Sequence, residues 1–225
     1  MSNVFAKKNL GQNFLTDKNK VREIISALNL NEDSKVIEVG PGRGALTKDI
    51  FEITKNFTVI EIDDDLIDDL KTYDGMNVIH DDVLKVNLKE LAKDETVFVS
   101  NLPYYISSKI LFKVLENKNF VSANVMLQKE LVDRIYAEPN TKTYGRLSVA
   151  IRTFFDVEKI IKVPKTCFSP APNVESAFII LKRKEDFTEH RNEYLDFIKV
   201  SFAQKRKKWL NSLKNNNFEF YNDLN

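Results

Sequence analysis

The chain has 225 residues, of which 43% are hydrophobic and 30% charged, and its formal net charge is +1. This length and composition predict one globular domain, or one domain with a small appendage, and no apolar run is long enough to span a membrane. One cysteine, Cys167, and two histidines, His80 and His190, predict no internal disulfide, no Cys/His metal site and a reducing, cytoplasmic location.

Apolar runs alternate with helical patterns along most of the chain. Strands are expected over Lys35–Val39, Phe57–Glu61, Asn77–His80, Thr96–Ser100, Ala123–Gln128, Glu158–Val163 and Ser176–Leu181. Helices are expected over Lys18–Leu28, Ala45–Lys55, Asp64–Tyr73, Ser108–Glu116, Lys129–Ala137 and Arg146–Phe155, the first of them capped by Asp17. This alternation predicts an α/β fold with a mainly parallel sheet covered on both faces.

The connection between the last two expected strands differs from the others. Residues Pro164–Asn173 contain three prolines and no helical pattern, so the connector suits an antiparallel strand better than a crossover helix. Beyond Lys184 a helical pattern extends to about Leu213. We therefore expect a main domain over residues 1–184 and a short helical segment over residues 185–225.

The first expected strand leads into a glycine-rich turn, Gly40–Gly44, and then into a helix. Glycines let the backbone approach a ligand closely, and the helix N-terminus presents free amides. Glu61 ends the next strand about twenty residues later, where an acid binds the ribose of a nucleotide-like cofactor. A dinucleotide and S-adenosylmethionine are both cofactors that fit this glycine-rich turn and acid. Asp82 and Val83, which would contact the adenine amino group and ring, favour the second.

The stretch Asn101-Leu102-Pro103-Tyr104 follows the fourth expected strand. In open α/β sheets, ligands bind outside the carboxyl ends of the strands. The Asn101 side-chain oxygen and the Leu102 carbonyl are two acceptors, and Pro103 has no amide to compete with them. They can hold an exocyclic amino group while the Tyr104 ring stacks on the base. The stretch therefore predicts methylation of an adenine at its amino nitrogen.

A basic run without intervening acids lies beside Trp209 near the C-terminus. Basic side chains bind phosphates and an aromatic ring stacks on a base, although a solvated helix face has the same pattern. RNA contacts are expected from this run and from two earlier arginines. The residues are Arg134, Arg146, Lys205, Arg206, Lys207 and Lys208.

Eight segments in chain order resemble motifs of the KsgA family, the small-subunit ribosomal RNA adenine dimethyltransferases. They are Lys8–Leu15, Val36–Gly44, Val59–Asp63, Asn101–Ser108, Met126–Glu130, Tyr144–Val149, Phe168–Ser176 and Phe202–Lys207. The resemblance covers nearly the whole chain. It implies a Rossmann-like class I methyltransferase domain, with a seventh strand inserted antiparallel, and a helical C-terminal domain. It also implies transfer of two methyl groups from S-adenosylmethionine to each of two adjacent adenosines in a hairpin loop near the 3′ end of small-subunit rRNA.

The resemblance also implies the site residues. Phe168 would stack on the face of the target base opposite to Tyr104, although a core position under a loop is the other interpretation of this ring. The expected cofactor contacts are Gln12, Asn13, Leu15, Gly40, Gly42, Glu61, Ile62, Asp82, Val83 and Asn101. Family members usually continue well beyond the Phe202–Leu213 segment, so the helical domain of this chain is expected to be abbreviated.

Three other functions fit parts of the sequence. A sister family methylates large-subunit rRNA and confers macrolide resistance, but Tyr104-Tyr105, Tyr144–Val149 and Gln204–Lys207 are more similar to the small-subunit enzymes. A non-catalytic nucleic-acid-binding factor would not need an intact Asn101–Tyr104 motif. A nicotinamide enzyme would need a hydride-transfer site, and no segment is typical of one. The expected partner is the small ribosomal subunit or an assembly intermediate of it, bound by a monomer without a metal.

Overall fold

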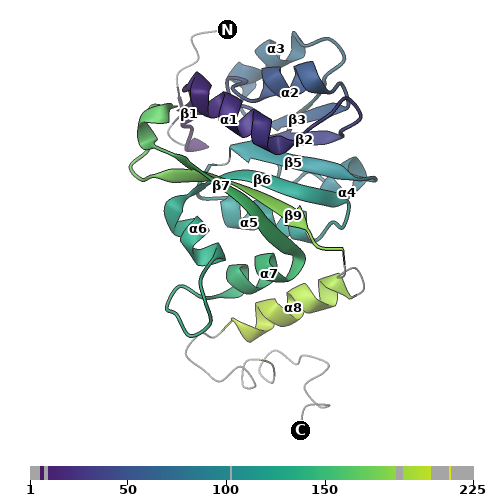
Figure 1. The fold of residues 1–225 in the computed structure, drawn as a ribbon. Helices are drawn as coiled ribbons and strands as arrows, with labels where there is room; N and C mark the ends of the chain where they lie inside the picture. Colours follow the sequence, from purple (N-terminus) through teal and green to yellow (C-terminus); the bar gives the residue numbers. More distant parts are fainter. Residues whose placement is uncertain (1–5, 8–9, 102, 186–189, 204–212, 214–225) are drawn as a thin grey trace.

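A computed structural model of the chain describes residues 6–7, 10–101, 103–185, 190–203 and 213. Its main strands are β2 (Val36–Val39), β3 (Phe57–Glu61), β4 (Asn77–His80), β5 (Thr96–Asn101), β6 (Phe120–Gln128), β7 (Phe155–Val163) and β9 (Ser176–Arg183). They form a seven-stranded sheet in the order β4-β3-β2-β5-β6-β9-β7 (Figure 1). β9 runs antiparallel to β6 and β7, whereas the other neighbouring pairs are parallel. The expected Rossmann-like fold with one antiparallel strand is therefore confirmed.

A second, two-stranded sheet joins parts of the chain far apart in the sequence. β1 (Phe14–Leu15) pairs antiparallel with β8 (Phe168–Ser169), so that Leu15 lies opposite Phe168. The sequence pattern did not predict this pairing, because two residues are too few to show the alternation of a strand. The pairing fixes the N-terminal segment to the proline-rich connector.

Helices cover both faces of the main sheet. They are α1 (Lys18–Leu28), α2 (Thr47–Ile53), α3 (Asp64–Lys71), α4 (Leu88–Leu91), α5 (Ser107–Leu115), α6 (Lys129–Ile135), α7 (Arg146–Phe154) and α8 (Arg191–Ser201), with a 3₁₀ turn, η2, over Lys165–Cys167. α1 begins as predicted, because the Asp17 carboxylate accepts hydrogen bonds from the amides of Asn19 and Lys20. The four-residue α4 was not predicted.

Side chains alternate between the two faces of the sheet along each strand. On β9, Phe178 and Ile180 belong to the buried cluster that includes residues of α1 and α2, whereas Ile179 and Leu181 belong to the cluster that includes residues of α5, α6 and α7. This alternation buries both faces, as expected for a parallel sheet between two helical layers. Within the described part of the chain, no helix is long and apolar enough to cross a membrane.

The described part of the C-terminal segment packs on the main domain. Leu195 and Ile198 of α8 belong to the same buried cluster as α7, and the Tyr194 ring meets Phe154 edge-on at 5.9 Å (Figure 1). The boundary at residue 184 and an abbreviated helical unit after α8 stay predictions. Residues 204–212 and 214–225 lie outside the described residues.

Ile179 on β9 and Ile160 on β7 lie opposite each other in the sheet, and replacing each of them tests how β9 packs. Ile179 on β9 has no exposed surface, and Ile160, opposite it on the edge strand β7, is 42% exposed. We expect Ile179→Ala to lower the free energy of unfolding by ~2–5 kcal/mol, because it leaves a cavity in the core. Ile160→Ala should cost less than about 1 kcal/mol in the same chemical denaturation experiment. Equal losses would contradict this packing.

Candidate active site

A cavity lies at the carboxyl ends of the parallel strands. It encloses about 1170 Å³ of empty space, part of it open to solvent. Its walls are residues 10–15, 38–43, 45–46, 60–62, 81–84 and 103–106, together with Asn101. The N-terminal segment therefore meets the ends of β2, β3, β4 and β5 at one place. This is the position at which open α/β sheets bind ligands.

The glycine-rich turn after β2 packs closely against the N-terminal segment. Gly42 has a φ of +56°, and a Cβ at this position would lie 3.1 Å from the Phe14 ring. A larger residue would be strained in its backbone and would also displace the ring. The Arg43 guanidinium lies 4.5 Å above the same ring. Phe14 thus fixes the turn on the side where the N-terminal segment closes the cavity.

Two acids from adjacent strands are buried in the wall. The Glu61 carboxylate accepts hydrogen bonds from the amides of Gly42 (3.2 Å), Ile62 (2.9 Å) and Asp63 (3.0 Å). Burial raises the pKa of Glu61, and these three amides oppose that effect. Burial also raises the pKa of Glu38 to about 8, although the Thr47 hydroxyl donates to it at 2.7 Å. Glu61 is therefore held in one orientation at the end of β3.

The turn after β4 supplies another acid and an apolar surface. One Asp82 oxygen accepts a hydrogen bond from the Leu84 amide at 2.9 Å. Val83 is buried and lies in the cavity wall. Ile62, from the end of β3, also borders the cavity and is 48% exposed. An acid beside two aliphatic side chains is suited to a flat, amino-bearing ring system.

Asn101 ends β5 and lies in the cavity wall. Its Nδ2 group donates to the Asn13 carbonyl at 3.4 Å, so Oδ1 is the atom that can accept from a ligand. Tyr104 is half-buried, and its hydroxyl and that of Ser176 are 2.8 Å apart. Burial raises the pKa of Tyr104. Leu102 lies outside the described residues.

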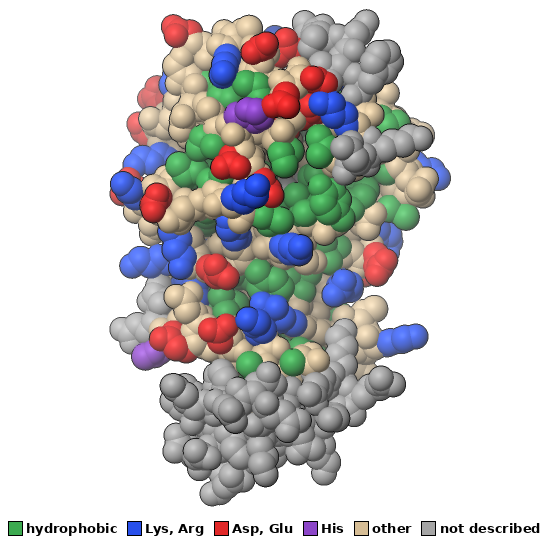
Figure 2. Space-filling model, turned by 180° about the vertical axis from the view of Figure 1, so that it is seen from behind, with side chains coloured by type: hydrophobic (Ala, Val, Ile, Leu, Met, Phe, Trp, Pro, Cys, Tyr) green, Lys and Arg blue, Asp and Glu red, His purple; other side chains and the backbone are tan. Residues whose placement is uncertain are grey.

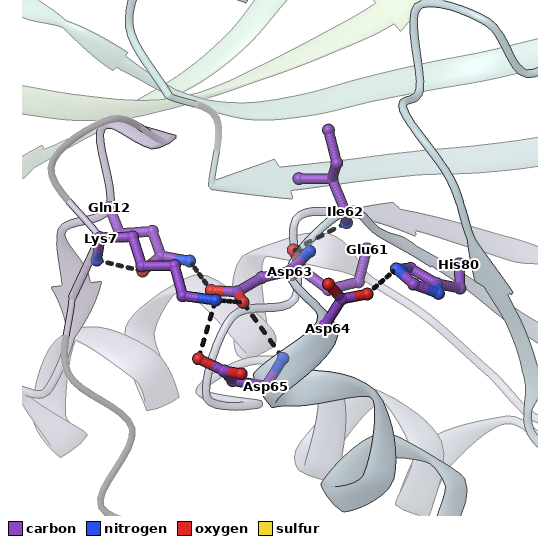
Figure 3. Close-up of polar contacts among 8 residues, drawn as sticks. All are labelled: Lys7, Gln12, Glu61, Ile62, Asp63, Asp64, Asp65 and His80. Carbon is purple, nitrogen blue, oxygen red and sulfur yellow. Dashed lines mark hydrogen bonds and ion pairs between the residues drawn. The ribbon is translucent and has the colours of Figure 1, made fainter.

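A polar clasp ties the N-terminal segment to the end of β3 (Figure 3). Asp63 is 1% exposed and accepts from the Lys7 ammonium and, at 2.5 Å, from Gln12 Nε2. Gln12 Oε1 in turn accepts from the Lys7 amide at 2.7 Å. Burial opposes ionisation of Asp63, but bonds from Lys7, Gln12 and the Asp65 amide together hold its pKa below the usual value. We call Lys7, Gln12 and Asp63 the N-terminal clasp.

Three other predicted residues, Phe168, Arg134 and Arg146, do not line the cavity. Phe168 is 5% exposed in β8 and is not among the residues that line the cavity. Arg146 begins α7 with its guanidinium 3.8 Å above the Phe112 ring, and burial lowers its pKa. Arg134 is half-buried in the last turn of α6. Lys205–Lys208 lie outside the described residues. The roles of these residues in stacking and RNA binding stay predictions.

A family model described as "Ribosomal RNA adenine dimethylase" matches residues 3–222. The chain belongs to this family. It is 44% identical over 214 residues to "Ribosomal RNA small subunit methyltransferase A" of Malacoplasma penetrans, covering 94% of this chain and 79% of the relative. The resemblance to the small-subunit rRNA adenine dimethyltransferases is confirmed.

Two solved structures of related enzymes have the same fold. A dimethyladenosine transferase from Plasmodium falciparum has a TM-score of 0.77 and 29% identity, covering 91% of this chain and 76% of that one. The 23S rRNA methyltransferase ErmE has a TM-score of 0.69 and 27% identity, covering 90% and 84%. This chain is therefore built like enzymes that methylate adenosine or ribosomal RNA.

The cavity brings together all ten residues predicted to contact a cofactor. They are Gln12, Asn13, Leu15, Gly40, Gly42, Glu61, Ile62, Asp82, Val83 and Asn101. Sequence reasoning did not single out Lys7 or Asp63 for the site. Asp63 precedes a helical pattern, which is typical of an N-cap, but its contact with Lys7 joins residues 56 positions apart. Among the described residues, no group of three or more His, Cys, Asp or Glu side chains could hold a metal ion.

The N-terminal clasp predicts how easily the N-terminal segment opens. Asp63→Asn keeps an N-cap for α3 but removes the charge that Gln12 contacts and one of the two carboxylates, Asp63 and Asp65, that Lys7 contacts. We expect trypsin to cleave after Lys7 at least about tenfold faster, since a hydrogen bond to a charged group is worth ~1.5–3 kcal/mol. Asp64→Asn is the matched control, because Asp64 instead pairs with His80 at 2.9 Å (Figure 3). Equal cleavage rates in the two variants would contradict the clasp.

Proposed function

We propose that this protein transfers methyl groups from S-adenosylmethionine to the amino nitrogens of two adjacent adenosines in the 3′-terminal hairpin loop of small-subunit rRNA. Each adenosine receives two methyl groups, and the reaction belongs to ribosome biogenesis. The observation that supports this most directly is the position of Asn101, which borders the same cavity as Glu61 and Asp82. One site therefore contains an amide oxygen, on Asn101, that can bind a target amine. It also contains two acids, Glu61 and Asp82, that can bind a nucleoside.

The wall residues fit the cofactor group by group. S-adenosylmethionine, when bound, supplies a sulfonium methyl group that an amine nitrogen can attack. Glu61, oriented by three backbone amides, retains acceptor capacity for ribose hydroxyls. Asp82 accepts from the adenine amino group, while Ile62 and Val83 contact the faces of the ring. The Gly40–Gly42 turn allows the remaining part of the cofactor to approach the backbone closely.

Asn101 activates the target amine. Its Oδ1 atom and the Leu102 carbonyl accept the two amino protons, which pulls the nitrogen lone pair out of conjugation with the ring. The same acceptors stabilise the positive charge that develops on the nitrogen during transfer. No strong base is required, because the protonated product amine loses its proton to water. Alignment of the amine with the methyl group supplies much of the remaining acceleration.

Tyr104 and Phe168 position the target base by stacking on its two faces. The base has to leave its own stack to enter the cavity, and an adenosine in a loop leaves at a lower cost than a paired one. Arg134, Arg146 and Lys205–Lys208 contact the RNA backbone. Figure 2 shows hydrophobic side chains in the middle of one face, with several lysine and arginine side chains and a few acidic ones below them. Such a face suits a nucleic acid that offers both bases and phosphates.

We also propose that the protein acts in the cytoplasm as a monomer and without a metal. Its one cysteine, Cys167, is a buried free thiol, which suits a reducing compartment. The alternative of a large-subunit enzyme has weaker support, because identity is 44% to a small-subunit relative and 27% to the 23S rRNA methyltransferase.

Replacement of Asn101 tests the chemistry. We expect Asn101→Ala to lower methyl transfer to undermethylated small ribosomal subunits by at least about a hundredfold, as is usual for the loss of a transition-state hydrogen bond. Binding of S-adenosylmethionine, measured by calorimetry, should change little. Asn56→Ala is the control, since Asn56 is exposed and lies at the opposite end of the strands. Near-normal transfer by Asn101→Ala would contradict the mechanism.

The same assay tests the substrate when large-subunit RNA is included in parallel. Label recovered as dimethyladenosine in the small-subunit 3′ hairpin is the expected result. Label found in large-subunit RNA alone would assign the protein to the alternative reaction. An absence of label in both RNAs, with cofactor binding intact, would favour a non-catalytic role in subunit assembly.

A pair of variants separates the ring of Tyr104 from its hydroxyl. Tyr104→Phe loses only the contact with Ser176, so transfer should fall by less than about threefold. Tyr104→Ala loses the stacking surface, which is worth ~1–3 kcal/mol per base, and kcat/KM for RNA should fall about 10- to 100-fold. Steady-state kinetics with small subunits measures both effects. Equal losses would show that the hydroxyl, and not the ring, is required.

A further inference from the structure

Lys113 lies on α5, and its ammonium group binds the turn that follows β4. It donates to the carbonyls of Val83 (2.7 Å), Leu84 (3.0 Å) and Val86 (2.5 Å). An ammonium group has three protons, so all of its donors are used on one short segment. Lys113 is not among the residues that line the cavity, and no sequence motif singles it out.

The geometry of the turn explains why it needs a cation. The Asp82 carbonyl accepts from the amides of Lys85 (2.8 Å) and Val86 (3.2 Å), and the Asp82 side chain accepts from the Leu84 amide. The backbone amides of Leu84, Lys85 and Val86 thus all donate hydrogen bonds to Asp82. Carbonyls at the end of such a turn lack the next helical amides, as at a helix C-terminus. Lys113 satisfies three of these carbonyls from outside the turn.

One side of the turn borders the cavity, and the other side binds Lys113. Asp82, Val83 and Leu84 border the cavity, and the carbonyls of Val83, Leu84 and Val86 bind Lys113. Asp82 also acts electrostatically on Lys113: burial lowers the pKa of the ammonium, and the Asp82 carboxylate raises it. A loss of the ammonium group would therefore free the segment that sets the position of the Asp82 carboxylate.

We propose that Lys113 is a positioning residue that sets the adenine specificity of the cofactor site by fixing the Asp82–Val86 turn. This inference rests on the proposed function, in which Asp82 accepts from the adenine amino group. A carboxylate accepts from an amino group and repels a carbonyl oxygen at the same place on the ring. Discrimination at this position requires a fixed carboxylate, because a mobile one can turn away from the wrong ligand.

Two ligands that differ at the amino position and at the proton on the adjoining ring nitrogen N1 measure the effect. They are S-adenosylhomocysteine and its deaminated analogue, in which hypoxanthine replaces adenine. Calorimetric dissociation constants give a discrimination ratio without any methyl transfer. In the wild type, we expect adenine to be preferred by at least about tenfold, the order of one hydrogen bond to a charged group. In Lys113→Met, the ratio should fall to about threefold or less.

Two controls separate positioning from general destabilisation. Asn117, just beyond the C-terminal end of α5, donates to the carbonyls of Leu88 (3.3 Å) and Ala92 (3.1 Å), which follow the turn in the chain. Asn117→Ala should lower the melting temperature but keep the wild-type discrimination ratio, since Lys113 still binds the turn that begins at Asp82. Lys109→Met removes an exposed lysine from the same helix and should change neither quantity.

The outcomes distinguish this inference from the proposed function. A wild-type protein without a preference for adenine would contradict the assigned role of Asp82, and both proposals would fall. A wild-type preference that Lys113→Met retains would overturn the role of Lys113 alone. If the methionine variant does not fold, Lys113→Arg replaces it. The planar guanidinium of arginine keeps the charge but cannot direct three donors to these carbonyls. The discrimination ratio of this variant must therefore fall as well.

Discussion

Parallel pairing of β2, β3, β4 and β5 is the constraint on which the site depends. In this register Val39 lies beside Ile60 and Ser100, so neighbouring strands end at nearly the same level. The residues that follow the strands therefore meet at one edge, although they are about twenty positions apart in the sequence. Backbone amides that the strands leave unpaired then orient the acids, as the three bonds to Glu61 show.

The N-terminal segment closes the cavity with few contacts of its own. A two-residue strand, the Phe14 ring against Gly42 and the polar clasp on Asp63 hold it in place. Such a segment opens at a lower free energy than the core, because Phe14 and Leu15 are its only buried apolar side chains among the described residues. Its closed position nevertheless completes the site, since Asn13 accepts from the Asn101 side chain. The proposed cofactor contacts and the orientation of the Asn101 amide are thereby linked.

The charges of the cavity suit its proposed cofactor. Glu61 and Asp82 are acids in the wall, and Arg43 lies over the Phe14 ring. Burial raises the pKa of the neighbouring Glu38 to about 8, so this carboxyl adds little negative charge at pH 7. In a partly buried site, acids favour a positively charged sulfonium and disfavour an anionic pyrophosphate. This argument separates the two cofactor classes that the glycine-rich turn alone left open. It also agrees with a transfer reaction in which positive charge moves from the donor to the target amine.

The sequence by itself determined the alternation of strands and helices, the glycine-rich turn, the acids at the strand ends and the motif from Asn101 to Tyr104. Local patterns carry these features, because side-chain periodicity and the residues after a strand are read over a few positions. Only the tertiary structure decided that Lys7 and Gln12 bind Asp63, that Leu15 pairs with Phe168, and that Lys113 binds the turn of Asp82. These contacts join segments about 30 to 150 residues apart. No local pattern records them, because only the packed chain brings those segments within hydrogen-bond distance.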